Sequence, residues 1–532
     1  MGISVFSFKR TLRVTVFGLF LCVNYSALAQ FPNVGGRLTG SFDSYTQFYQ
    51  SDQKINAILP QDKVGSNNYF KLDYQSGVFS AGLQYESYAP SIAGYPYSIN
   101  QSKLINRYFK YAPKDFSIQV GDIYDQFGSG LVFRAWENQE IGINNAIEGV
   151  RVTVTPAPFV SVKALYGRQR KVFEHAASIV RGIDAELDLT NLNPNYTGNT
   201  HVTAGGSYVT RYQEYTGPDS TFNATVSAVS GRVGITGSDA SLDLEYVQKS
   251  SDPSSANNND KSTGKAILIN GTYAKNNLGI NLTLRSIENL DFRGERGEIG
   301  TSVPVNFIPA LTRQHDYLTT TIYVYAAQAL AETAGQLDIF YTIKGSQSRP
   351  SRIAFNLAHY GGLNNNNLFS PGNQAYYNDA NIEWKKKWNE KWTSTLSYYN
   401  IFYNKTVVEG GIHPNINANI VVLNALYQYT KRNSFRFELQ NLSTRQDDGN
   451  WGAAVAEFGF APTFTFFLSD LYNYDVTKVN YPNLGGSYAK GSSRFSVNYG
   501  RQRAGLFCVG GVCRYVPAAT GITLTLTTTF SK

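Results

Sequence analysis

Apolar and polar residues alternate with a period of two along most of the chain from Gly36 onward. In residues 150–155 the valines take every second position, as do the large apolar residues of 337–343, 435–440 and 494–499. Turn-forming residues interrupt this pattern every ten to twenty residues. The pattern predicts antiparallel strands with one apolar face and one polar face.

The connections between these predicted strands alternate between short and long. The short ones are 112–115, 156–158, 237–240, 275–277, 388–392 and 431–434, and the long polar ones are 51–66, 89–103, 250–264, 289–316 and 403–417. Tight turns at one end and long loops at the other are typical of outer-membrane barrels.

The last predicted strand, 521–530, places Ile522, Leu524, Leu526 and Phe530 on one face and threonines on the other. An aromatic residue near the end of an alternating final strand resembles the C-terminal signal of bacterial outer-membrane barrels. Here Phe530 is displaced inward by Ser531 and Lys532.

A secreted antiparallel sandwich or a solenoid would show the same one-sided alternation. The number of hairpins, the lack of a repeat period and the final strand favour a barrel, which also leaves no sheet edges open and can span lipid. We predict an all-β protein, a single large transmembrane antiparallel up-and-down barrel of about 24–26 strands. Successive strands of such a barrel should run alternately outward and inward across the membrane. Among 25 candidate strands, however, the neighbours 352–360 and 378–387 both run inward, so either a strand hides in 361–376 or the count is wrong nearby.

The first residues of the chain indicate a signal peptide. Lys9, Arg10 and Arg13 precede an apolar stretch at 14–23 that is too short to span a bilayer, and Ala27-Leu28-Ala29 is a small-residue cleavage site. A lipoprotein signal at Cys22 is disfavoured because Leu21 precedes it.

We expect cleavage between Ala29 and Gln30, a signal peptide at 1–29 and a barrel at 30–532. Strand signals begin within ten residues of Gln30, which leaves no room for an N-terminal plug domain.

Composition agrees with strands rather than membrane helices. Aromatic residues make up 14% of the chain and charged residues 16%, and the mean hydropathy is −0.28. The net charge of +8 falls to +5 without the signal peptide. This mild excess gives no case for nucleic acid as a partner.

The chain shows no catalytic or metal-binding motif. Its five histidines have no metal-ligand spacing, and Gly485-Gly486-Ser487-Tyr488-Ala489 departs from a nucleophile elbow at its last residue. We therefore expect no enzyme activity, no cofactor and no metal.

Cys508 and Cys513 flank Val509-Gly510-Gly511-Val512. The glycine pair supplies the two positive-φ residues of a two-residue hairpin, in which Val509 faces Val512 and Cys508 faces Cys513. That spacing, in an exported chain, predicts a cross-strand disulfide that fixes the shape of an outward loop. A redox or metal role is the alternative.

The segment 121–151 combines glycines with charged residues. Its charges are Asp122, Asp125, Arg134, Glu137, Glu140, Glu148 and Arg151. One interpretation is a rim or inward-folded loop whose charges pair with the barrel wall, and the other is a constriction or docking loop that sets selectivity. Basic residues that suit a polar lumen or rim are Arg168, Arg170, Lys171, Arg501 and Arg503.

The stretches GDIYDQFGSGLVFRAWEN, INNAIEGVRV and GRQRAGLFCVGGVCRYVP resemble those of an uncharacterised family of outer-membrane barrels from Bacteroidota, with the cysteine hairpin as the most specific element. The resemblance implies a barrel in the outer membrane of a Gram-negative bacterium and leaves function open. Members of the family occur in bacteria that use type 9 secretion.

Two functions fit these features. The first is a channel or transport barrel for a polar solute, with its lumen narrowed by inward-folded loops, because a barrel this wide needs a plug. The second is a structural or accessory subunit of an outer-membrane secretion or surface-export assembly. The expected partners are outer-membrane lipid, the barrel assembly machinery and, for the second function, a plug or secretion partner.

Overall fold

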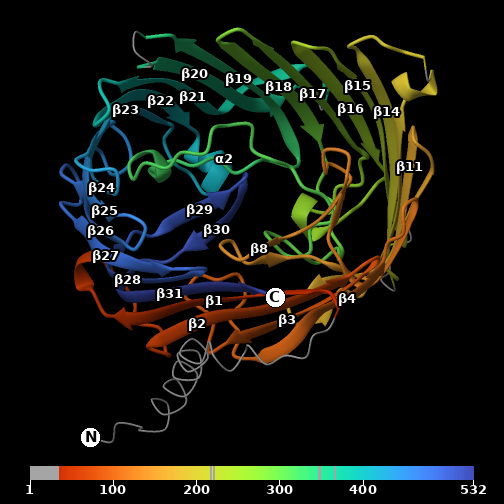
Figure 1. The fold of residues 1–532 in the computed structure, drawn as a ribbon, viewed down its shortest axis with the longest axis horizontal. Coiled ribbons are helices and arrows are strands. Elements are labelled where there is room, and N and C mark those ends of the chain that lie inside the picture. The colour runs from red at the N-terminus through yellow and green to blue at the C-terminus, as the bar shows by residue number, and fades with distance from the viewer. Residues whose placement is uncertain (1–34, 194, 216–218, 220–221, 346–348, 365–366) are drawn as a thin grey trace, which may run out of the picture.

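Antiparallel strands form one closed ring, which Figure 1 shows end-on. The computed structural model describes residues 35–193, 195–215, 219, 222–345, 349–364 and 367–532. The first strand, β1 (Arg37–Gln50), pairs with the last, β31 (Ala519–Ser531), from Thr39 opposite Ser531 to Gln50 opposite Thr520. The predicted signal peptide and its cleavage site lie outside the described residues.

The ring contains 24 strands. Between β1 and β31 they are β2 (Val64–Ser76), β3 (Phe79–Tyr88), β4 (Ser102–Tyr111), β5 (Phe116–Ile123), β10 (Ile147–Ala157), β11 (Val160–Lys171), β13 (Ile179–Asp188), β14 (His201–Tyr212), β15 (Thr225–Thr236), β16 (Ala240–Lys249), β17 (Gly264–Lys275), β18 (Leu278–Glu288), β19 (Ala331–Ile343), β20 (Ser351–Leu363), β21 (Pro371–Lys387), β22 (Trp392–Tyr403), β23 (Ile416–Gln428), β24 (Asn433–Ser443), β25 (Trp451–Phe460), β26 (Phe464–Asn473), β27 (Asn480–Lys490) and β28 (Ser493–Gln502). The two-residue β12 (Glu174–His175) only extends the end of β11. The predicted fold class is confirmed.

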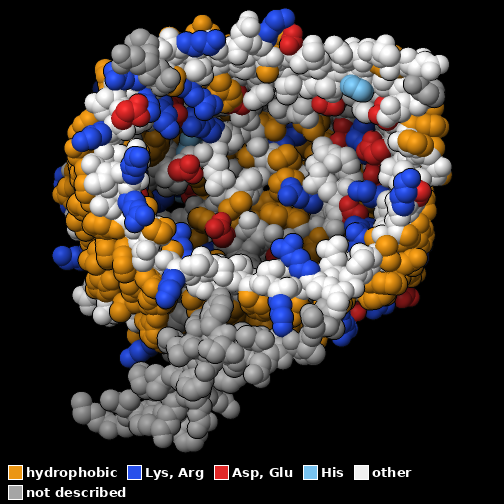
Figure 2. Space-filling model, in the orientation of Figure 1, with side chains coloured by type: hydrophobic (Ala, Val, Ile, Leu, Met, Phe, Trp, Pro, Cys, Tyr) orange, Lys and Arg blue, Asp and Glu red, His pale blue; other side chains and the backbone are white. Residues whose placement is uncertain are grey.

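Alternation sorts side chains between the two faces of the wall. In β24, Phe437 and Leu439 point outward and are 38% and 44% exposed, whereas Glu438 and Gln440 point into the ring and are buried. Large apolar side chains cover the outer wall in Figure 2. A wall with an apolar outside and a polar inside suits a lipid-embedded barrel.

The two ends of the ring differ as predicted. At the end we call the turn end, Leu38 and Lys532 exchange backbone hydrogen bonds, and connections such as 276–277 and 491–492 are tight. The opposite end, the loop end, carries the long connections, among them 124–146 and 289–330.

The strand directions predicted from the sequence are wrong in one respect. β20 and β21 form a hairpin, paired from Ser351 opposite Lys386 to Leu363 opposite Pro371 with register shifts near Gly361, so the described residues of 361–376 belong to these two strands and the connection between them. β20 runs toward the loop end, opposite to the direction predicted for 352–360. The ring has one strand fewer than the 25 candidates, and its 24 strands lie within the predicted total of 24–26.

Three segments from the loop end fold into the ring, where Figure 1 shows β8, β29 and β30. They are 124–146, 289–330 and 503–518, and together we call them the plug. Their short elements are β6 (Asp125–Phe127), β7 (Phe133–Ala135), β8 (Glu137–Asn138), β9 (Ile143–Asn144), η5 (Thr320–Ile322), β29 (Gly505–Val509) and β30 (Val512–Val516). The remaining helical turns are η2 (Gln53–Ile55), η3 (Thr190–Leu192), η4 (Ser255–Asn257) and α2 (Lys405–Glu409). In the described part of the chain, no helix is long and apolar enough to cross a membrane.

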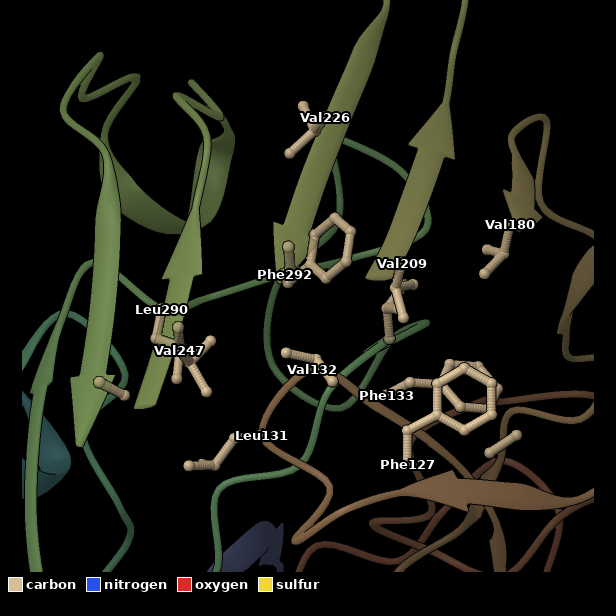
Figure 3. Packing of buried hydrophobic residues seen from close by; sticks show 14 of the residues in the cluster. Phe127, Leu131, Val132, Phe133, Val180, Val209, Val226, Val247, Leu290 and Phe292 are labelled. Carbon is tan, nitrogen blue, oxygen red and sulfur yellow. The ribbon is translucent and has the colours of Figure 1, made fainter. Parts of the chain in front are cut away.

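The apolar core lies between the plug and the inner wall. Figure 3 shows Phe127 and Leu131, Val132 and Phe133 of the plug beside wall valines such as Val209, Val226 and Val247, all buried. A second cluster packs Tyr323 and Tyr325 of the plug against wall strands β19 to β26. Burying a side chain of this size contributes about 2 kcal/mol, so the plug is a packed part of the fold.

Candidate functional site: the lumen and its plug

The plug segment 124–146 is tied to the wall by ion pairs. Asp125 accepts hydrogen bonds from Arg151 at 2.9 Å and from Lys163 at 3.0 Å. Glu137 lies 3.8 Å from Lys71 and accepts a hydrogen bond from the Gln84 amide at 2.7 Å. These contacts fix the segment against β2, β3, β10 and β11, as the inward-folded interpretation of the sequence requires.

Arg134 and Glu140, also in the plug segment 124–146, use other contacts. The Arg134 guanidinium carbon lies 4.8 Å from the ring centroid of Trp136 and 4.1 Å from that of Phe307. Burial lowers the pKa of Arg134 from its ordinary value. The backbone carbonyl of Glu140 accepts a hydrogen bond from Arg514 at 2.9 Å.

Asp122 and Glu148, also predicted as loop charges, are outside the lumen. They stand opposite each other in β5 and β10 and share the outward face with Val120 and Val150. Arg168 likewise shares the outward face of β11 with Tyr166. The prediction that they could line a constriction is therefore not supported by their positions, since a period of two places them on the outer face of the wall.

The plug segment 289–330 is anchored beside the two strands that it connects, β18 and β19, where a buried ion pair lies. Arg285 lies 2.5 Å from Glu332, and both side chains are fully buried. Tyr325 of the plug donates a hydrogen bond to Glu332 at 2.7 Å. Burial, with the nearby Glu332 carboxylate, raises the pKa of Tyr325 far above its ordinary value. The charges are thus mutually satisfied where water is excluded.

The middle of this segment is held to β21. His315 lies 2.5 Å from Asp379, and Arg313 lies 3.1 Å from Glu383. The Thr319 amide donates a hydrogen bond to the Gln440 side chain at 2.8 Å, which adds a contact to β24. The sequence predicts 289–316 only as a long polar loop. Its signal for packing is the spacing of Leu290, Phe292 and Val305, all buried in the structure.

The β29–β30 hairpin joins the plug segments. Val509 pairs with Val512 and Cys508 with Cys513, as predicted, and the two sulfurs are bonded with Cα atoms 4.0 Å apart. The hairpin lies at the loop end but folds inward, which the sequence did not predict.

Its tip is fixed by backbone contacts. The carbonyl of Gly510 accepts a hydrogen bond from the Ala310 amide at 3.1 Å, and that of Gly511 accepts one from the Ala327 amide at 3.3 Å. Arg514 donates to the Gly94 carbonyl at 2.7 Å. The hairpin therefore connects the 289–330 segment, the 124–146 segment through Glu140 and the β3–β4 loop.

A cavity of about 590 Å³ remains between the hairpin and the inner faces of β1, β27, β28 and β31. Its lining combines amide and phenol groups, Tyr45, Gln47, Tyr49, Asn67, Gln139, Tyr481, Asn483, Asn498 and Gln502, with as many apolar side chains, among them Phe48, Ile92, Leu318, Leu471, Leu506, Phe507, Val516 and Ile522. The charged lining residues are Glu140, Arg501, Arg503 and Arg514. This volume is in the range of small-molecule sites. Figure 2 shows the end of the ring hollowed, with basic and acidic side chains around the inner wall.

One of these arginines is neutralised. Arg501 Nε donates to Asp52 at 2.6 Å, and Thr520 donates to the same carboxylate at 2.9 Å. Burial alone would raise the pKa of Asp52, but these hydrogen bonds and the Arg501 charge bring it below its ordinary value. Arg503 has no carboxylate within ion-pair distance in the described part of the chain. The cavity therefore carries a small positive excess.

Among the described residues, no three histidine, cysteine or acidic side chains are grouped as metal ligands would be.

The fold and the lumen define the class of this protein: a closed 24-strand antiparallel barrel filled by its own loops. Residues 10–530 match a family of unknown function, DUF6029, and the chain belongs to that family. No curated protein matches the chain.

Several solved barrels are similar in fold. The P pilus usher (PapC) translocation pore is 8% identical, with a TM-score of 0.45, over 93% of this chain and 99% of the usher chain. The siderophore receptor PirA from Pseudomonas aeruginosa is 11% identical, with a TM-score of 0.39, over 93% and 80%. OccAB3 from Acinetobacter baumannii is 9% identical, with a TM-score of 0.37, over 93% and 99%. At these levels the likenesses carry no argument about function.

Proposed function

We propose that this chain is an outer-membrane channel of a Gram-negative bacterium that passes a small polar solute through a lumen narrowed by its own loops. The apolar outer face of the wall, together with inward-facing polar side chains such as Glu438 and Gln440, supports the membrane location. The short connections, the start of β1 and the end of β31 lie at the turn end, which by the general plan of such barrels faces the periplasm. The loop end then faces the cell exterior. We assign the chain no catalytic role.

The observation that carries this proposal is the plug beside a cavity that carries amide, phenol and arginine groups. A subunit that waits for a partner to close it would leave its lumen wide, whereas here three segments of the chain itself pack against the wall. This favours the channel over the accessory subunit of a secretion or surface-export assembly.

The lining of the cavity points to the class of solute. Amide and phenol groups can donate and accept hydrogen bonds without charge, which suits hydroxyl-rich or carbonyl-bearing molecules. Arg503 and Arg514 against Glu140 add a small positive excess. The solute we propose is neutral or anionic, and its size is limited by the hairpin.

Single-channel recording in planar bilayers tests the proposal. Refolded protein is compared with a variant in which 504–517 is replaced by a short glycine-serine linker. The matched control shortens the exposed connection 474–479, which lies at the loop end but outside the cavity. All three proteins must first show heat-modifiable migration on gels.

We expect discrete small steps for the unaltered chain and the control, and clearly larger steps for the variant without the hairpin. If the folded chain and its hairpin variant are both silent, the channel is wrong and the accessory subunit is favoured. If the folded chain does not partition into membranes, the location is wrong as well.

A further inference from the structure

The outward face of the wall changes character abruptly near the loop end of β4, β5, β10 and β11. Phe109, Val120, Val150 and Tyr166 form an apolar row and are 38–52% exposed. Two positions further toward the loop end, each strand carries a charge instead; these are Arg107, Asp122, Glu148 and Arg168. Glu148 stands opposite both Asp122 and Arg168, so the charges lie side by side across the sheet.

The wall is notched at this boundary. β4 pairs with β5 only from Tyr108 opposite Gly121 to Tyr111 opposite Ile118, and the strands separate beyond that point. Gly121 has a φ of +102°, a backbone conformation that a residue with a side chain would adopt only with strain. Beyond that point the Asp122 carboxylate, in place of a strand carbonyl, accepts a hydrogen bond from the Arg107 backbone amide at 2.7 Å.

Glycines form the row between the charges and the apolar residues. Gly149 stands opposite Gly121 on one side and Gly167 on the other. A Cβ atom at Gly149 would lie 1.9 Å from the Tyr166 carbonyl oxygen, so no side chain fits there. On the outward face at this boundary lies an open depression of about 710 Å³, lined by Arg107, Glu148, Arg168 and the apolar row.

Three arginines, Arg107, Arg168 and Arg181, stand at this notch against two acids, Asp122 and Glu148. Arg107 and His175 share Glu148, at 3.3 Å and 2.5 Å. Arg168 is exposed and has no ion pair in the described part of the chain. Arg181, on the neighbouring strand β13, lies over the Tyr166 ring at 5.7 Å and also has no carboxylate partner there. Two guanidinium groups thus stand unneutralised at the edge of an apolar belt.

We propose that this notch binds the phosphorylated headgroup of a glycolipid in the outer leaflet. Guanidinium groups bind phosphate through paired, charge-assisted hydrogen bonds, and basic pockets at a membrane surface select anionic headgroups. Phe109, Val120, Val150 and Tyr166 lie directly below and receive the acyl chains. A free phosphate would use the arginines but not this apolar row. The inference rests on the membrane location proposed above and is independent of channel activity.

Native mass spectrometry of the full refolded chain in detergent tests the proposal. The probes are bisphosphorylated lipid A, the same lipid without its phosphates, and inorganic phosphate. We expect one tightly held bisphosphorylated lipid, with binding at least about tenfold weaker for the dephosphorylated lipid, as the loss of a charged contact implies. Inorganic phosphate should neither be retained nor compete.

The Arg168→Gln/Arg181→Gln double variant should lose the same factor of about ten. The matched control is Lys265→Gln, which removes an outward-facing cation of β17 that lies outside the notch and 4.0 Å from Glu288. Equal binding of both lipids to the unaltered chain would overturn the proposal without any variant, as would full retention of binding by a folded double variant. Displacement of the lipid by inorganic phosphate would also overturn it, in favour of a phosphate site. Failure of the chain to insert into membranes would instead contradict the proposed outer-membrane location.

Discussion

The carboxylate of Asp125 lies 2.9 Å from the guanidinium of Arg151, with only 9% and 14% of the two side chains exposed. Asp125 belongs to the plug and Arg151 to the inner face of β10, so this pair crosses the boundary between the part that fills the lumen and the part that encloses it. Lys163 of β11 binds the same carboxylate at 3.0 Å. Contacts of this kind hold the plug against the wall.

Asp125→Asn should loosen the plug without dismantling the barrel. Breaking a little-exposed ion pair leaves Arg151 and Lys163 without a counter-charge, at a local cost of about 3 kcal/mol. We expect more frequent and longer open events in planar bilayers and faster amide exchange in 124–146.

The control for this change is Asp239→Asn, which removes an exposed ion pair with Lys275 of the same 2.9 Å length at the turn end. A surface pair contributes about 1 kcal/mol or less, so its channel record should match the unaltered chain. Identical gating in both variants would show that the Asp125 contacts do not hold the plug.

Removing the cysteine pair should affect the plug more than the barrel. The Cys508→Ser/Cys513→Ser variant opens a very short loop, so the thermal unfolding temperature should change little. The hairpin tip holds Ala310 and Ala327 of the 289–330 segment, and a looser tip should increase current noise. Thiol labelling before and after reduction checks that the bond forms in the purified chain. Labelling of both cysteines in the untreated, folded protein would contradict the disulfide.

Arg503→Gln should change ion selectivity. Arg503 lines the cavity without a carboxylate partner in the described part of the chain, whereas Arg501 is neutralised by Asp52. We expect the reversal potential in a salt gradient to shift away from anion preference, with little change in folding. Arg494→Gln is the control, since Arg494 lies near the turn end of β28 and does not line the cavity. An unchanged reversal potential in Arg503→Gln would show that the ions do not pass through this cavity.

Alkali should open the plug. Burial raises the pKa values of Tyr317, Tyr323 and Tyr325 above the ordinary value near 10. A raised folded pKa means that the stability from these neutral phenols is fully present below about pH 10 and is lost as the pH rises beyond it. Tyrosinate absorbance and conductance, followed together from about pH 9 to about pH 12, should rise in step.

Tyr325→Phe should move this alkaline transition to higher pH, because phenylalanine cannot ionise. Tyr196→Phe is the control, since Tyr196 is 41% exposed in the connection between β13 and β14. Ionisation of all tyrosines near pH 10 with no change in conductance would be inconsistent with a plug held by buried phenols.

The sequence by itself determined the strands, their faces and the distinction between the two ends. Period-two alternation, as in Phe437 to Gln440, is a local property that any sheet with one apolar face must satisfy, and turn lengths are equally local. The two-residue Cys508–Cys513 hairpin could be predicted for the same reason, because its glycines set the geometry within six residues.

Tertiary structure alone decided what fills the lumen and which charges meet. Asp125 and Asp122 are three residues apart and look alike in the sequence, yet one binds Arg151 inside the ring and the other faces outward beside Arg107. The difference arises where the strand ends and the chain turns inward. His315 finds Asp379 across 64 residues of sequence, and ring closure joins Thr39 to Ser531. Such pairings depend on the register of the whole ring, and a local alternation pattern carries no information about register between distant strands.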